Sequence, residues 1–227
     1  MKRTSIQFLT FALALLWAAS TTSKAQDLYV ASELNSTVGE YNATTGAAIA
    51  GFTSPSGLSN PACLAISGND LYVAIIGSNS VGEYNATTGI AIGSYISPTG
   101  LDEPYGLAVS GGNLYVSNVG NNTVGEYDAT TGAAIAGFTT ITGLSSPIGL
   151  ALWGGDIYVA NTDGDTVGEY NATTGATITG FTSPSGLSDP IFIAVSGSVP
   201  EPRTWATMLG GLGLLGGIRC FRRSWRG

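Results

Sequence analysis

Carboxylates are the side chains in the middle of this chain that could do chemistry. They can act as general acids and bases on a polysaccharide, or as ligands for a hard cation such as Ca²⁺. Residues 27–198 contain every acidic residue of the chain except Glu201, but no Lys, Arg or His. This region therefore lacks the usual general base, a basic partner that could activate a serine, and a cation that could hold a phosphate. We predict that the protein is not an enzyme.

One loop collects acidic residues in a pattern that resembles the start of a calcium-binding loop. It reads Asn161-Thr162-Asp163-Gly164-Asp165, with alternating oxygen ligands around a glycine. A complete EF-hand would also need a bidentate glutamate at its twelfth position and two flanking helices, which we do not expect here. Asp163 and Asp165 are therefore a calcium candidate beside the simpler interpretation as a turn. No other cofactor is predicted.

The charge distribution excludes one class of partner. The formal net charge of the 227 residues is −7, and all 8 Lys and Arg residues lie outside residues 27–198. A region without cations cannot neutralise a phosphate backbone, so we expect no nucleic-acid binding. The two cysteines, Cys63 and Cys220, offer no disulfide framework or metal spacing, and Cys63 fits a small buried apolar position.

The elements that carry these residues are tandem copies of one unit. The phrase D/N-L/I-Y-V recurs at residues 28, 71, 114 and 157, always 43 residues apart. The phrase V-G-E-Y recurs with the same step from residue 38, and so do four prolines: Pro61, Pro104, Pro147 and Pro190. A fixed period of this length is typical of proteins that stack one supersecondary unit on copies of itself.

Each copy contains four short apolar runs separated by turn residues, and none has helical periodicity. In the third copy we expect strands at 106–110, 114–117, 123–127 and 133–139. The N-A-T-T-G and D-A-T-T-G segments between the last two strands are predicted hairpin turns rather than glycosylation sites. Four antiparallel strands in this length make one blade of a β-propeller, so the sequence predicts an all-β propeller over residues 27–198.

The repeats also resemble those of NHL-type and YVTN-type propellers, in the run P-x-G-L-A-V-x-G-G-N-L-Y-V. The resemblance implies that the first strand of each blade lies nearest the axis, at 63–67, 106–110, 149–153 and 192–196. Residues 27–198 open on a second strand and close on a first strand. We predict that the first strand at 192–196 pairs beside residues 28–31, which closes four blades of four strands each. The alternatives are two chains in one ring of eight blades, and an open solenoid.

One glutamate recurs on the third expected strand of every copy, directly before a tyrosine: Glu40, Glu83, Glu126 and Glu169. Because third strands lie away from the axis, these carboxylates should not converge on one ion. We predict four copies of a solvent-facing residue.

Polar loops at one rim of the propeller could bind sugar hydroxyls or peptide backbones. They contain Asn35, Asn79, Asn121, Asn161, Tyr105, Asp102 and Glu103. The same residue types make ordinary turns, so the sequence does not identify a ligand.

Residues 1–25 read as an export signal. Lys2 and Arg3 precede an apolar run at 8–19, and Ser23 and Ala25 place small residues at −3 and −1 of a cleavage site before Gln26. The run is short for a membrane span.

Residues 199–227 have three parts in a fixed order. Pro200, Glu201 and Pro202 are followed by a short glycine-rich apolar stretch at 205–218, and then by a basic cluster: Arg219, Arg222, Arg223 and Arg226. The stretch would cross a membrane weakly, with its arginines retained in the cytoplasm.

This order resembles the PEP-CTERM sorting signal of Gram-negative bacteria. The resemblance implies that an exosortase in the inner membrane recognises Pro200, Glu201 and Pro202 and cuts nearby, after export by the Sec machinery and transient insertion of the C-terminal segment. It also implies a product at the cell surface or in the extracellular matrix, linked to exopolysaccharide or to another surface protein. The alternative is an ordinary C-terminal membrane anchor.

We therefore expect an exported propeller with a binding or structural role. One alternative is a secreted enzyme that acts on polysaccharide through carboxylates such as Asp102 and Glu103. Another is an inert spacer whose repeats only fill the cell surface.

Overall fold

The computed structural model describes residues 27–93 and 97–196, and every regular element longer than one turn in them is a β-strand. The all-β prediction is therefore confirmed. The strands are β1 (Asp27–Ser32), β2 (Thr37–Asn42), β3 (Pro61–Ser67), β4 (Asp70–Ile75), β5 (Ser80–Asn85), β6 (Pro104–Ser110), β7 (Asn113–Asn118), β8 (Thr123–Asp128), β9 (Pro147–Trp153), β10 (Asp156–Asn161) and β11 (Thr166–Asn171). A single 3₁₀ turn, η1 (Ile76–Ser78), precedes β5.

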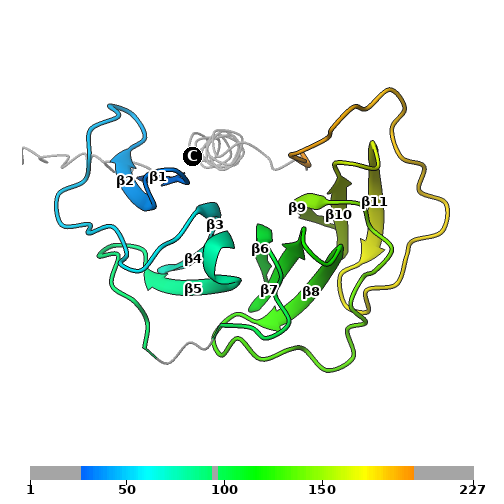
Figure 1. The fold of residues 1–227 in the computed structure, drawn as a ribbon, viewed down its shortest axis with the longest axis horizontal. Coiled ribbons are helices and arrows are strands. Elements are labelled where there is room, and N and C mark those ends of the chain that lie inside the picture. The colour runs from blue at the N-terminus through cyan, green and yellow to red at the C-terminus, as the bar shows by residue number, and fades with distance from the viewer. Residues whose placement is uncertain (1–26, 94–96, 197–227) are drawn as a thin grey trace, which may run out of the picture.

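The strands form four small antiparallel sheets, one for each copy of the repeat. Their orders are β1-β2, β3-β4-β5, β6-β7-β8 and β9-β10-β11. Figure 1 shows the sheets fanned around one side of a common centre, with β3, β6 and β9 innermost. Neighbouring sheets contact each other through these first strands, as the repeat resemblance implied.

The hydrophobic core lies between neighbouring sheets. Side chains of the second strand alternate between the two faces of a sheet, and both faces are covered. Leu71 and Val73 of β4 pack toward Val38 and Tyr29 of the preceding sheet. Tyr72, the residue between them, packs in a second cluster with residues of the following sheet. A blade in the middle of the fan therefore has no solvent-facing side.

The expected fourth strand is reduced to isolated bridges. Tyr127 bridges to Ala134, and the N–H of Ile135 donates to the Glu126 carbonyl oxygen at 3.1 Å. Gly137 then interrupts the pairing, with a φ of 99° that favours glycine, before Ile141 bridges back to Val124 of β8. In the first copy the Ser54 hydroxyl accepts the Val38 N–H at 2.9 Å and takes the place of a ladder bond. Among the described residues, three sheets therefore have three strands and the first has two, instead of the four predicted for each blade.

The predicted closure of the ring within one chain is also absent. Among the described residues, the segment 190–196 is not a strand, and nothing pairs with the free edge of β1. The layers of large side chains between the sheets set the angle at which the sheets fan. At that angle, four sheets cover only one side of the centre, and the two ends of the repeat region lie apart (Figure 1).

The hairpin turns are built as the sequence predicts. The Oδ1 atom of Asn42 accepts the N–H groups of Thr44 and Thr45, both at 2.9 Å. Asn85, Asp128 and Asn171 make the same pair of contacts with the residues two and three positions later. The recurring N-A-T tripeptide is thus turn chemistry, in which the side chain caps its own backbone.

Candidate functional site

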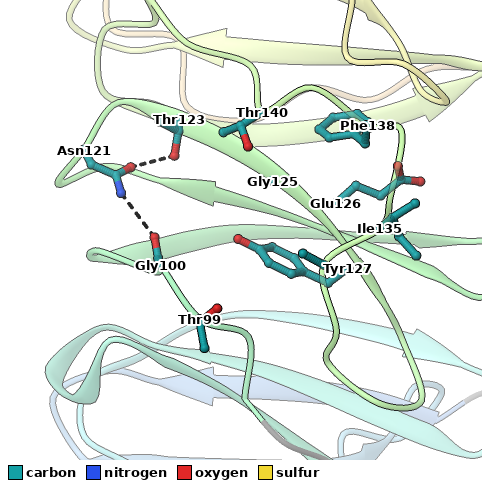
Figure 2. Close-up of a pocket in the computed structure, with 11 residues that line it drawn as sticks. Thr99, Gly100, Asn121, Thr123, Gly125, Glu126, Tyr127, Ile135, Phe138 and Thr140 are labelled. Atoms are coloured by element: carbon teal, nitrogen blue, oxygen red, sulfur yellow. Dashed lines mark hydrogen bonds between the residues drawn. The ribbon is translucent and has the colours of Figure 1, made fainter.

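A pocket of about 240 Å³ opens between β8 and the loops beside it (Figure 2). One end is polar: the Asn121 amide donates to the Gly100 carbonyl oxygen at 3.3 Å, and the Thr123 hydroxyl donates to Asn121 Oδ1 at 2.6 Å. Glu126 and Phe138 lie at the other end of the pocket. The Tyr127 ring lies between the polar end and this end. Hydroxyl, amide and aromatic groups at this spacing suit a small polar ligand such as a sugar.

Glu126 is buried, with only 4% of its surface exposed, and Glu40 and Glu83 are each 5% exposed. Glu169 is half-buried. The prediction of solvent-facing glutamates is therefore wrong, because the faces of a blade in the fan are covered by neighbouring sheets. Alternation along a strand distinguishes the two faces of a sheet, but it does not show that one of them faces water.

Each glutamate is the cross-strand partner of a tyrosine. Tyr115 lies opposite Glu126, and its hydroxyl donates to Glu126 Oε1 at 2.7 Å and lies 2.9 Å from the Ala172 carbonyl oxygen of the next sheet. Asn113 adds a second bond to the same Oε1 atom at 2.7 Å. The tyrosines of D/N-L/I-Y-V and the glutamates of V-G-E-Y thus link strands within a sheet, and Tyr115 also links two sheets.

The tyrosine hydroxyls are poor acids in this setting. Desolvation by burial is the main cause that raises the pKa values of Tyr29, Tyr72 and Tyr115, and the partner carboxylate raises them further. For the more open Tyr158, the hydrogen bond to Glu169 is the main cause, and it raises the pKa to about 12. These hydroxyls therefore remain protonated donors at physiological pH, which suits a structural role.

Glu83 differs from Glu126 in its surroundings. Burial raises the pKa of Glu83, the Tyr72 hydrogen bond opposes this shift, and the nearby Asp70 carboxylate adds to it. The third copy has Asn113 where the second has Asp70, and Asn113 donates to its glutamate. Among the described residues, the Oε2 atoms of Glu40, Glu83 and Glu126 are all buried and have no hydrogen-bond partner.

We predict that Glu83→Gln stabilises the protein at neutral pH by about 1 kcal/mol, because it removes a buried charge with one unpaired oxygen. A raised pKa in the folded state means that folding is favoured below the ordinary pKa of glutamate. That contribution is lost as the pH rises through the folded-state pKa. Thermal unfolding from pH 4 to pH 8 should show the gain only at the upper end. Asp70→Asn, which copies the third repeat, should give a smaller gain in the same direction, and an equal gain at every pH would contradict this explanation.

The polar loop residues hold neighbouring sheets together. Asn79 Oδ1 accepts the Glu103 N–H at 2.8 Å, and Asn122 Oδ1 accepts the Ser146 N–H at 2.7 Å. Asp165 stands at the equivalent position of the fourth copy and accepts the Asp189 N–H at 2.8 Å. Its φ of 50° lies in the left-handed region, where Asn and Asp are tolerated better than most residues. Asp165 is therefore a structural turn residue.

Asp163 lies in the same loop, and its carboxylate accepts the Ser146 hydroxyl. Among residues 27–93 and 97–196, no third His, Cys, Asp or Glu side chain lies close enough to Asp163 and Asp165 to complete a metal site. A calcium ion here would need backbone carbonyls and water for most of its ligands.

We predict that Asp165→Ala lowers the free energy of unfolding by about 1 kcal/mol, because it removes a hydrogen bond and places alanine in a left-handed conformation. Asp165→Asn should leave stability nearly unchanged, because asparagine serves at this position in the second and third copies. Urea titrations with calcium and with EDTA measure both effects. A calcium-dependent gain that Asp163→Ala removes would instead support the calcium candidate.

A second pocket, of about 330 Å³, lies beside the turn between β9 and β10. Trp153 lines it with 55% of its surface exposed, together with Asp156 and Tyr115. The other copies have serine at the position of Trp153: Ser67, Ser110 and Ser196. Trp153 was not among the predicted site residues, although its departure from the serine of the other copies was a signal that could have identified it.

Several other predicted residues have structural roles or lie outside the described structure. Glu103 has a left-handed φ of 47° at the turn before β6, and the Asp102 N–H donates to Asn118 Oδ1 at 3.3 Å. The sorting residues lie outside the described residues: Ala25, Pro200, Glu201, Pro202, Arg219, Arg222, Arg223 and Arg226. Within the described part of the chain, no helix has the length and hydropathy of a membrane span, and the predicted apolar stretch at 205–218 falls beyond it.

The fold is similar to that of designed β-propeller proteins. The crystal structure of the computationally designed Ika8 protein aligns with a TM-score of 0.58 and 17% sequence identity, over 75% of this chain and 50% of that chain. The designed Ika4 protein aligns with a TM-score of 0.51 and 17% identity, over 64% of this chain and 84% of that chain. The alignment with Ika8 thus spans about half of that protein's length. No protein-family model and no curated protein matches the sequence.

Proposed function

We propose that this protein is an exported propeller and that an exosortase trims its C-terminus. The trimmed domain then has a binding or structural role at the cell surface or in the extracellular matrix of a Gram-negative bacterium. The observation that carries the proposal is the order of residues 199–227: Pro-Glu-Pro, a short apolar stretch and four arginines, Arg219, Arg222, Arg223 and Arg226. The apolar run near the N-terminus supports export.

The processing step has a direct test. In a host with an exosortase, the wild-type chain is expected to lose mass at its C-terminus, and Glu201→Gln is expected to keep the unprocessed mass. Asp189→Asn is the matched control, because Asp189 is also an acidic residue directly before a proline. Intact-mass spectrometry of the membrane and extracellular fractions distinguishes the forms. A wild-type chain that stays whole in the membrane would indicate an ordinary anchor, and unchanged trimming of Glu201→Gln would exclude recognition through that glutamate.

The pocket beside Trp153 is the place where we propose that exopolysaccharide binds. An exposed indole offers a flat apolar surface to the C–H face of a sugar ring, and Asp156 can accept hydrogen bonds from sugar hydroxyls. Trp153→Ser restores the residue of the other copies, so it should fold normally and lose retention on the host polysaccharide. Leu34→Ser also replaces an exposed apolar side chain, but in the loop after β1 and outside both pockets, so this control should keep its retention. No binding on a glycan and peptide array would favour the inert spacer.

The enzyme alternative has less support from the arrangement of side chains. A glycosidase uses two carboxylates that flank the bond to be cut. Among the described residues, Glu126 is the only acidic side chain that lines its pocket, and Asp156 is the only one beside Trp153. Turnover of the polysaccharide that is lost on replacing Asp102 or Glu103 would restore this alternative.

A further inference from the structure

The first sheet exposes apolar side chains that every other sheet buries. Leu28 and Val30 of β1 are 48% and 43% exposed. The equivalent residues of the other sheets are all 0% exposed: Leu71, Val73, Leu114, Val116, Ile157 and Val159. Those residues pack on the preceding sheet, and β1-β2 has no preceding sheet among the described residues. The sheet also lacks the first strand that borders β4, β7 and β10.

The other end of the repeat region supplies a first strand without a sheet. A Cβ atom on Gly106 of β6 would lie 1.9 Å from the Ile148 carbonyl oxygen of β9. A Cβ atom on Gly149 of β9 would lie 2.3 Å from the Ile191 carbonyl oxygen. The segment 190–196 therefore approaches β9 as β9 approaches β6. Phe192 in this segment is 81% exposed.

We propose that two copies of this chain join head to tail, with the segment 190–196 of each copy completing the β1-β2 sheet of the other. The four sheets of each copy would then make one ring of eight. Each copy would bury Leu28 and Val30 against the last sheet of its partner. Since both junctions are the same, the assembly closes and leaves no free end for further growth.

The repeat predicts the register of the new strand pair. In the second sheet, Leu64 lies opposite Val73 and Ile66 opposite Leu71. Shifting these pairs by whole repeats places Ile193 opposite Val30, and Val195 opposite Leu28, of the second copy. A strand at this edge would satisfy the backbone groups that β1 now leaves unpaired, which otherwise invite uncontrolled association.

The tyrosines predict a hydrogen bond at the same junction. The Tyr29 hydroxyl lies 2.8 Å from the Ala86 carbonyl oxygen in the next sheet, and Tyr115 makes the equivalent contact with Ala172. Tyr158 stands at the same position in the last sheet and donates to Glu169. A second copy would place the Ala43 carbonyl oxygen where the Tyr158 hydroxyl can reach it.

The shape of one copy favours a second copy over closure of one chain on itself. The sheets fan around one side of their centre, and β1 and residues 190–196 lie at opposite ends of the fan (Figure 1). The alignment with the designed Ika8 propeller covers 50% of that chain, so one copy supplies about half of a propeller of that length. Two copies can close the ring without changing the angle between sheets, which the buried side chains fix.

Cross-linking between two tagged full-length chains tests the junction. One chain carries Val30→Cys and the other Ile193→Cys, both in a background with Cys63→Ala and Cys220→Ala. Mild oxidation is expected to give a covalent dimer with both tags. Leu64→Cys with Val73→Cys in one chain is the positive control, because these residues already lie opposite each other. A third sample carries Val30→Cys and Ile193→Cys in the same chain. A cross-link within that chain, with none between chains, would overturn the proposal. The absence of any cross-link while the control reacts would overturn it as well.

The mass of the assembly gives an independent test. Full-length protein in mild detergent is expected to show about twice the mass of one chain by light scattering. Val30→Lys should reduce this mass about twofold and keep the β-sheet circular dichroism signal. Ile66→Lys is the matched control, because Ile66 and Val30 are both 43% exposed, and it should remain a dimer. If Val30→Lys loses the β-sheet signal, Val30→Thr replaces it. A single-chain mass for the wild-type protein at micromolar concentration would refute the assembly.

Discussion

Replacing Leu114 by alanine is expected to lower the free energy of unfolding by about 2 to 5 kcal/mol. Leu114 is 0% exposed and lies between two sheets, in a cluster with Tyr72 and Leu107. Removing its side chain leaves a cavity that β-strands cannot easily close, because the hydrogen bonds of both sheets hold their strands in place. The loss is expected to be large for a chain whose sheets have only two or three strands.

Leu34→Ala is the control for this experiment, because Leu34 is 96% exposed in the loop after β1 and should change stability very little. Urea unfolding followed by tryptophan fluorescence measures both variants. Equal losses from Leu114→Ala and Leu34→Ala would mean that the layer between the sheets does not hold the fan together.

Replacing Gly106 by alanine is expected to cost about 1 to 3 kcal/mol. The new Cβ atom would lie 1.9 Å from the Ile148 carbonyl oxygen and 2.7 Å from the Ser117 hydroxyl. The Ser117 hydroxyl also accepts the Gly106 N–H and donates to the Ile148 carbonyl oxygen, each at 2.8 Å. The substitution therefore forces β6 and β9 apart and breaks the bonds that join the two inner strands.

Gly93→Ala is the matched control, because a Cβ atom at Gly93 would meet nothing within 4 Å and its φ is not positive. This variant should be neutral, or more stable by about 0.4 to 1 kcal/mol, through a smaller loss of chain entropy. Melting temperatures of the two variants give the comparison. A neutral Gly106→Ala would show that the inner strands can separate without cost, and that they do not fix the angle between sheets.

The local structure of each copy was predictable because it depends on neighbours in the sequence. The runs L/I-Y-V and V-G-E-Y predict strands, and each lies inside an observed strand in all four copies. The Asn42 turn was predictable for the same reason, since its side chain caps a backbone only two and three residues away. The interruption of the fourth strand was not predictable, because its apolar residues favour a strand, whereas the φ of 99° at Gly137 separates the bridge at Ala134 from the bridge at Ile141.

The burial of Glu126 and the position of Trp153 depend on other sheets. A glutamate in an alternating strand normally faces water, but here its cross-strand tyrosine and the neighbouring sheet cover it. Trp153 becomes a pocket residue only because the turn that carries it lies beside Tyr115 of the preceding sheet. The part that the neighbouring sheet plays in both cases leaves no trace within a single repeat.

The sequence alone determined the period, the strands that carry L/I-Y-V and V-G-E-Y, the turns and the export hypothesis, because each rests on residues close together in the chain. The tertiary structure alone decided which faces are buried and whether β1 meets the segment 190–196 of the same chain. Those outcomes depend on the angle between sheets, and that angle is set by side chains such as Leu71 and Val38, which belong to different copies of the repeat. Identical repeats can build rings of different size, since a small change in that angle accumulates with every sheet.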